Sequence, residues 1–161
     1  MINKNQNNRL HPIPYFLACL ITMFTLDIYS TNRILHNIFV STDNFKFLDI
    51  VYVQNTGAAF SSFQHATTVL IVISILAIIM ILVELLRDIY KYSIPMYFAS
   101  AMLITGITCN TWERITLGYV RDFLSLKFIE FPVFNISDIL INFGVLIIMI
   151  LIISKKYKRN V

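Results

Sequence analysis

Charged side chains are scarce in this 161-residue chain, at 14% of its residues. An ordinary soluble domain is about 25% charged and roughly 45–50% apolar. Here 57% of the residues are hydrophobic and the mean hydropathy is +0.71. This composition excludes an ordinary soluble domain and favours a small membrane protein. The net charge of +4 comes without a basic aromatic patch, so we do not expect nucleic-acid binding.

Residues for metal, thiol or nucleotide chemistry are equally few. The three histidines, His11, His36 and His65, are scattered, and both cysteines, Cys19 and Cys109, lie within apolar stretches. The sequence contains no metal-ligand spacing and no serine-hydrolase motif, and its four glycines form no phosphate-binding loop. We therefore expect neither a metal nor an organic cofactor.

Apolar runs are abundant, and four of them approach the ~20 residues that a helix needs to cross a bilayer. We predict spans at about residues 13–30, 67–86, 95–111 and 136–154. The third is short and contains hydroxylated residues such as Thr105 and Thr108, so we expect it to pack among the other helices. The predicted fold class is an all-α membrane protein with four transmembrane helices in one domain, residues 1–161.

The distribution of basic residues predicts the orientation of the chain. Eight of its 13 Lys and Arg residues lie at the two ends and after the second span. They are Lys4, Arg9, Arg87, Lys91, Lys155, Lys156, Lys158 and Arg159. Because positive charge is retained on the cytoplasmic side, we expect both termini inside, with residues 1–12 as a cytoplasmic tail. Loops 31–66 and 112–135 would then face outward.

Both outer loops contain segments typical of strands. Residues 44–54 and 123–131 are rich in aromatic and β-branched side chains, and the second segment partly alternates. Asn55 and Gly57 mark a turn after the first segment. We therefore predict a small extracytoplasmic β-sheet.

Two aspartates flank the outer ends of the last two spans. Asp138 lies seventeen residues before Lys155, which is ~25 Å along a helix, so it falls near the outer interface if Lys155 marks the inner one. Asp122 follows the third span at a similar depth. Each has a simple structural interpretation: Asp138 as an acid in the first turn of a helix, and Asp122 as a surface loop residue.

Taken together, the two acids suggest chemistry. Two carboxyl groups in one poorly solvated site do not both ionise easily, so one stays protonated while the other is charged. Such a pair supplies a general base that activates water and a general acid that protonates a departing nitrogen. Asp122 and Asp138 are therefore candidates for metal-free amide hydrolysis.

Three ordered blocks also resemble a known family. They are "NTGAAFS" (Asn55–Ser61), "NTWERITLGYVRDF" (Asn110–Phe123) and "FPVFNISD" (Phe131–Asp138). In order and spacing they resemble the motifs of the lipoprotein signal peptidases, also called signal peptidase II. The resemblance implies an aspartyl endopeptidase of the bacterial inner membrane, with its site near the outer leaflet. It further implies cleavage of signal peptides from prolipoproteins that carry a diacylglyceryl-cysteine.

The resemblance also implies roles for individual residues. Asp122 and Asp138 would be the catalytic pair, and Asn55, beside the turn at Gly57, would contact the substrate backbone. Polar positions that shape the site would be Asn110, Arg114 and Asn135. The implied partners are prolipoproteins and membrane lipids, and we expect a monomer.

Several residues depart from the family pattern. Glu113 stands where the family has aspartate, and we expect it to pair with Arg114 or the backbone. Cys109 replaces a glycine, and Ser137 replaces a common alanine. Near the end of the first span, Asp27 is kept, as a site-supporting residue.

A lysine that usually follows that aspartate is absent here, because Thr31 occupies its place. Arg33 is the expected source of a displaced charge. The alternative to an enzyme is a non-enzymatic small membrane protein: a lipoprotein-binding relative, a scaffold or a transporter subunit. Against transport, the chain shows neither repeated halves nor broken helices.

Overall fold

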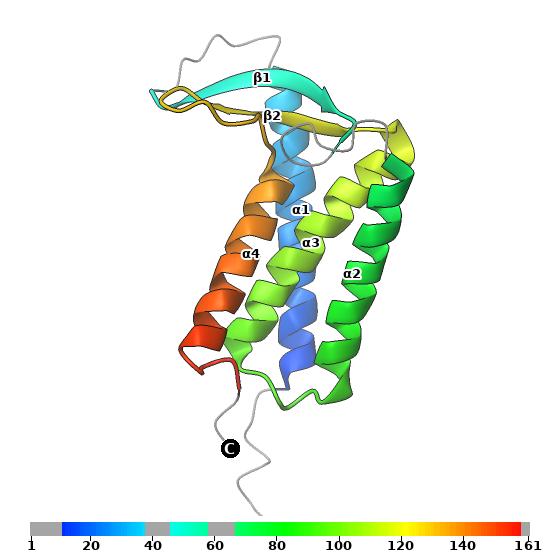
Figure 1. Ribbon diagram of the computed structural model, residues 1–161, viewed down its shortest axis with the longest axis vertical. Helices are drawn as coiled ribbons and strands as arrows, with labels where there is room; N and C mark the ends of the chain where they lie inside the picture. The colour runs from blue at the N-terminus through cyan, green and yellow to red at the C-terminus, as the bar shows by residue number, and fades with distance from the viewer. Residues whose placement is uncertain (1–10, 38–45, 58–66, 159–161) are drawn as a thin grey trace, which may run out of the picture.

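The computed structural model describes residues 11–37, 46–57 and 67–158 as a helical bundle capped at one end by a small sheet (Figure 1). The helices are α1 (Pro12–Asn37), α2 (Thr67–Arg87), α3 (Ile94–Leu117) and α4 (Ile136–Ile153). The strands are β1 (Leu48–Asn55) and β2 (Val120–Leu126). The helical fold and the small sheet are confirmed.

Among the described residues, three helices are long and apolar enough to cross a membrane, namely α1, α2 and α4. The third predicted span is part of α3, which falls short of that composition because polar residues such as Ser100, Thr105 and Asn110 interrupt it. A fourth transmembrane helix is therefore not established by length and hydropathy.

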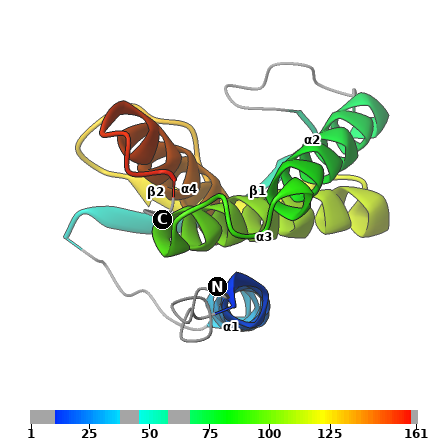
Figure 2. The same cartoon turned by 90° about the horizontal axis from the view of Figure 1, so that it is seen from below.

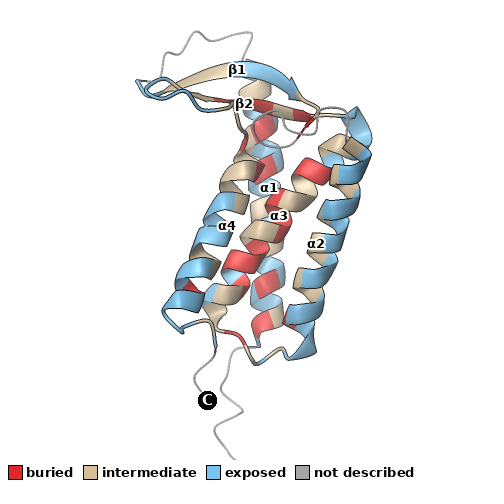
Figure 3. Ribbon diagram, in the orientation of Figure 1, coloured by how far each residue is buried: buried red, intermediate tan, exposed pale blue. Residues whose placement is uncertain are grey.

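Helix α3 is the centre of the bundle. It packs against α1, α2 and α4, and its buried residues run along its length (Figure 3). Seen along the bundle, α1 lies on one side of α3, while α2 and α4 lie on the other (Figure 2). The prediction that this segment packs among the other helices is confirmed, because Tyr97, Ala99, Ala101 and Thr105 are all fully buried.

Two glycines allow α3 and α4 to approach closely. A Cβ atom at Gly106 of α3 would lie 2.3 Å from the backbone oxygen of Ser137. A Cβ atom at Gly144 of α4 would lie 2.9 Å from the backbone oxygen of Ala99. Small residues at such contacts are typical of helices that associate within membranes.

The sheet consists of two antiparallel strands and has an irregular register between Ile50 and Val53. β2 faces the bundle, with Val120, Asp122 and Phe123 buried, whereas the central residues of β1 are exposed. β2 also bridges to Phe134, which leads into α4. The sheet therefore ties the two outer loops to the start of α4.

The observed boundaries differ from several predictions. The second strand was predicted at 123–131 but spans 120–126, because pairing with β1 reaches back to Val120 and ends after Leu126. The first was predicted at 44–54 and spans 48–55, and residues 44 and 45 lie outside the described residues. The predicted outer loops also begin with helix, since α1 continues to Asn37 and α3 to Leu117. Helical hydrogen bonding continues past the apolar residues that hydropathy detects.

Candidate active site

Asp122 and Asp138 come from different elements and meet at one asparagine. The side-chain nitrogen of Asn135 donates to Oδ1 of Asp122 at 2.9 Å. The backbone nitrogen of the same residue donates to Oδ2 of Asp138 at 3.1 Å. The two candidate carboxylates thus belong to one hydrogen-bond network, although they are sixteen residues apart in sequence.

Local sequence fixes Asp138 in the first turn of α4. Asn135 is the N-cap, and its side-chain oxygen accepts a hydrogen bond from the backbone nitrogen of Asp138 at 2.9 Å. With the reciprocal bond from Asp138 this forms a capping box. The interpretation of Asp138 as a first-turn acid is therefore correct locally. Its second oxygen accepts from Asn110 of α3 at 2.8 Å, so the same carboxylate also serves the shared network.

Asp122 is not a surface loop residue, and that interpretation was wrong. It lies in β2 opposite Val53, is 2% exposed, and accepts a hydrogen bond from the side chain of Asn55 at 2.9 Å. Burial raises the pKa of Asp122 to about 7, and the negative charge of Asp138 contributes in the same direction. Asp122 therefore retains a proton over much of the range below neutrality.

Arg114 links the turn after β1 to the same site. Its guanidinium donates to the backbone oxygen of Gly57 at 2.9 Å and to the backbone oxygen of Asn110 at 3.3 Å. The backbone nitrogen of Gly57 in turn donates to the side chain of Asn55 at 2.9 Å. The predicted turn and the predicted polar residues of α3 thus lie together around the aspartates.

A cavity of about 510 Å³ opens onto this network. We call it the dyad cavity, because both aspartates of the candidate pair, Asp122 and Asp138, line it. Its polar wall is made by Asn55, Asn110, Arg114, Asp122 and Asp138. Its apolar wall comes from residues 131–134 and from Ile141 of α4. A cavity with a mostly apolar lining and a few convergent polar groups is typical of a ligand or substrate site.

Among the described ranges, no group of three or more His, Cys, Asp and Glu residues is placed to hold a metal ion. The polar groups that converge on the cavity are carboxylates, amides and one guanidinium. Such groups can transfer protons and orient a polar backbone.

Glu113 does not pair with Arg114, but it meets the alternative expectation of a backbone contact, because its Oε2 accepts a hydrogen bond from the backbone nitrogen of Arg121 at 2.7 Å. It forms an ion pair with Arg121, whose Nη2 lies 2.6 Å from Oε1 of Glu113. Consecutive residues on a helix point about 100° apart, so Arg114 faces the dyad cavity while Glu113 faces another side of α3. Arg121 is thus partly buried and paired.

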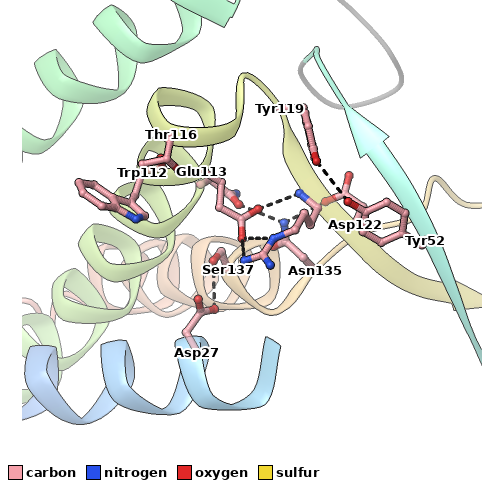
Figure 4. Close-up of polar contacts among 11 residues, drawn as sticks. Asp27, Tyr52, Trp112, Glu113, Thr116, Tyr119, Asp122, Asn135 and Ser137 are labelled. Carbon is pink, nitrogen blue, oxygen red and sulfur yellow. Dashed lines mark hydrogen bonds and ion pairs between the residues drawn. The ribbon is translucent and has the colours of Figure 1, made fainter. Parts of the chain in front are cut away.

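Asp27 is buried, at 5% exposure, and accepts a hydrogen bond from the hydroxyl of Ser137 at 3.0 Å (Figure 4). The hydrogen-bond partner of Asp27 is thus a neutral hydroxyl. That Arg33 supplies the positive charge of the missing lysine stays a prediction. Sequence reasoning missed the contact, although it had singled out both Asp27 and Ser137.

The fold and the site define a class, a helical membrane protein with two acids joined in one cavity beneath a small sheet. The family model described as "Signal peptidase (SPase) II" matches residues 19–154. The chain therefore belongs to the signal peptidase II family, which makes it a peptidase-family protein of bacterial membranes.

Curated relatives and solved structures agree with this assignment. The chain is 37% identical over 109 residues to the lipoprotein signal peptidase of Caldicellulosiruptor bescii, covering 67% of this chain and 69% of the relative. It is 33% identical over 115 residues to that of Enterococcus faecalis, covering 71% of each. A solved structure described as a bacterial membrane enzyme superimposes with a TM-score of 0.78 at 25% identity, covering 92% of this chain and 95% of that one.

Proposed function

We propose that this protein is an intramembrane aspartyl endopeptidase that removes the signal peptide from diacylglyceryl-modified prolipoproteins. Asp122 and Asp138 would activate the attacking water. The observation that supports this most directly is the bridging of both carboxylates by Asn135 at the wall of one cavity. Family membership supports the reaction and the class of substrate.

The chemistry requires one proton shared between the two carboxyl groups. The ionised aspartate takes a proton from water as the water oxygen attacks the scissile carbonyl. The protonated aspartate then gives its proton to the leaving nitrogen as the C–N bond breaks. The raised pKa of Asp122 supports this division of roles, because burial and the nearby charge of Asp138 both favour Asp122 as the carboxyl group that keeps the proton.

The residues around the pair would bind and orient the peptide. Asn55 and Asn110 each donate one hydrogen bond to a catalytic aspartate, so they hold the carboxylates and border the space for the substrate. Arg114 holds the Gly57 turn against this wall. An extended substrate would pair with β1, which contacts β2 along one edge. Charged substitutions along residues 46–53 should then weaken cleavage without unfolding the protein.

We further propose that α3 is a fourth span and that both termini are cytoplasmic. α3 is enclosed by three apolar helices, which would shield its polar residues from lipid. The basic residues Lys155, Lys156 and Lys158 follow α4 at the end of the bundle opposite the sheet. The sheet and the dyad cavity would then lie at the outer leaflet, where a diacylglyceryl anchor holds its scissile bond. The protein would act as a monomer, without a cofactor.

The test uses the full chain purified in detergent. It is given a prolipoprotein that carries diacylglyceryl on its cysteine, and the same precursor without the lipid as the matched control. We expect cleavage of the lipid-modified precursor and at most trace cleavage of the other. Binding of the lipidated precursor without turnover would instead support a non-enzymatic lipoprotein-binding protein.

A further inference from the structure

A second cavity, of about 460 Å³, lies between α1, α3 and the start of β2. Asp27, Glu113 and Arg121 line it, together with Cys109 and Trp112. Within the described part of the chain it shares no lining residue with the dyad cavity. The second cavity is therefore separate from the cavity that Asp122 and Asp138 line, and we call it the rear cavity.

The first polar contact in the rear cavity joins Glu113 to Arg121, the residue before Asp122. Glu113 of α3 accepts from the Nε and Nη2 atoms of Arg121 at 2.9 and 2.6 Å. Its other oxygen accepts from the backbone nitrogen of Arg121 at 2.7 Å. The glutamate thus holds the backbone and the side chain of the residue immediately before Asp122 (Figure 4).

The second polar contact joins Asp27 to Ser137, the residue before Asp138. The hydroxyl of Ser137 donates to Asp27 across 110 positions of sequence, and both residues are 5% exposed. This hydrogen bond joins α1 to the first turn of α4. It therefore holds the residue immediately before Asp138, as Glu113 holds the residue before Asp122.

We propose that these two contacts form a rear brace that positions the catalytic pair: Glu113 sets Asp122 through Arg121, and Asp27 sets Asp138 through Ser137. This rests on the proposed function and adds to it. All four members are positioning residues, because they act through the backbone of their neighbours.

The geometry of strands and helices explains why holding one residue orients the next. Neighbouring residues on a strand point to opposite faces. Anchoring the side chain of Arg121 in the rear cavity therefore directs the side chain of Asp122 toward the dyad cavity. In a helix, neighbours point about 100° apart, so anchoring Ser137 fixes the rotation of the turn that carries Asp138. The bonds to Glu113 are charge-assisted and little exposed, and such bonds resist displacement more than neutral surface contacts do.

The principal test is Glu113→Gln in the full chain, assayed on the lipid-modified precursor. Glutamine keeps an oxygen for the backbone nitrogen of Arg121 but loses the ion pair. Misplacement of a reacting group by up to ~1 Å lowers the rate by as much as ~100-fold, so we expect kcat to fall by about 10- to 100-fold. KM should stay within about twofold of the wild type, because the dyad cavity is unchanged.

Ser137→Ala tests the other half of the brace, and its kcat should fall in the same way with little change in KM. Glu84→Gln is the matched control. It makes the same carboxylate-to-amide change and breaks the ion pair between Glu84 and Lys91, 2.6 Å apart, which lies at the end of the bundle opposite the sheet and adjoins neither aspartate. We expect its kcat to equal that of the wild type.

The pH profile separates positioning from mere stabilisation. Asp122 is buried and faces the charges of Asp138 on α4 and Arg114 on α3. Loosening it in Glu113→Gln would admit water and shift the alkaline limb of kcat to lower pH. The reversed pair, Glu113→Arg with Arg121→Glu, should recover part of kcat, because it restores the ion pair without the bond to the backbone nitrogen.

Wild-type kcat and an unshifted pH profile in both Glu113→Gln and Ser137→Ala would overturn the brace. So would a loss explained wholly by less folded protein, with kcat per folded molecule unchanged. Failure of the proposed function is distinguishable, because the wild type would then bind the precursor without cleaving it, or, if another group performs the cleavage, Asp122→Asn would retain turnover.

Discussion

Substitution of Gly106 by alanine should separate α3 from α4 at the level of the aspartates. The new Cβ atom would lie 2.3 Å from the backbone oxygen of Ser137 and 2.7 Å from Cγ1 of Ile141, whereas ordinary contact begins at 3.4 Å. Relief of the closer contact therefore requires a shift of about 1 Å, against a backbone atom that has no freedom to rotate away. Overpacking of this kind lowers the free energy of unfolding by ~1–3 kcal/mol.

The shift would fall on the residue next to Asp138, so its effect on the reaction should be larger than its effect on stability. A displacement of ~1 Å at a reacting group lowers kcat by about 100-fold. The assay is cleavage of the lipid-modified precursor, with the thermal midpoint measured on the same preparation. Gly144→Ala is the comparison, because its Cβ atom would meet Ala99 at 2.9 Å, farther from the aspartates. It should lower the midpoint but largely spare kcat, and wild-type kcat in Gly106→Ala would refute this reasoning.

Three further predictions concern stability. Because the pKa of Asp122 is raised to about 7, the folded protein binds that proton more tightly than the unfolded chain. Its contribution to stability is lost as pH rises from about 4 to about 7, so the thermal midpoint should fall less over this range in Asp122→Asn than in the wild type, and an equal fall in both would contradict this. Lys155→Gly should raise the free energy of unfolding by ~1 kcal/mol in denaturant titrations, since Lys155 has a φ of 57°, and an unchanged value would contradict this. Tyr97→Phe loses the hydrogen bond from the Tyr97 hydroxyl to the backbone oxygen of Ile89 at 2.8 Å. It should lower the free energy of unfolding by ~1 kcal/mol without changing kcat. A large fall in kcat would argue against a purely structural role.

Hydropathy predicted where the helices lie because long apolar runs have few alternatives. The predicted second and fourth spans, 67–86 and 136–154, differ from α2 and α4 by one residue. Hydropathy failed at the polar ends of helices, since it does not detect the hydrogen bonding that carries α1 to Asn37 and α3 to Leu117. Hydropathy alone also could not decide whether α3 crosses the membrane. The polar residues of α3 are covered by α1, α2 and α4, and the hydropathy of one segment contains no information about the helices that pack against it.

The candidate site was predicted from the types of its residues and from family resemblance. The structure brings most of those residues together around Asp122 and Asp138, whereas Glu113 and Asp27 line the second cavity. Its rear contacts were not predictable. Glu113 had two arginines within reach, and only the direction of each side chain around α3 and β2 selects Arg121. The bond between Asp27 and Ser137 joins the first helix to the last, a distance in sequence at which periodicity carries no information.

The central claim is that Asp122 and Asp138 together activate one water molecule. The most direct measurement is turnover of the lipid-modified precursor by Asp122→Asn and Asp138→Asn, each shown to be folded by its thermal midpoint. The account predicts that both variants lose cleavage while still binding the precursor. Cleavage at the wild-type rate by either folded variant would contradict it.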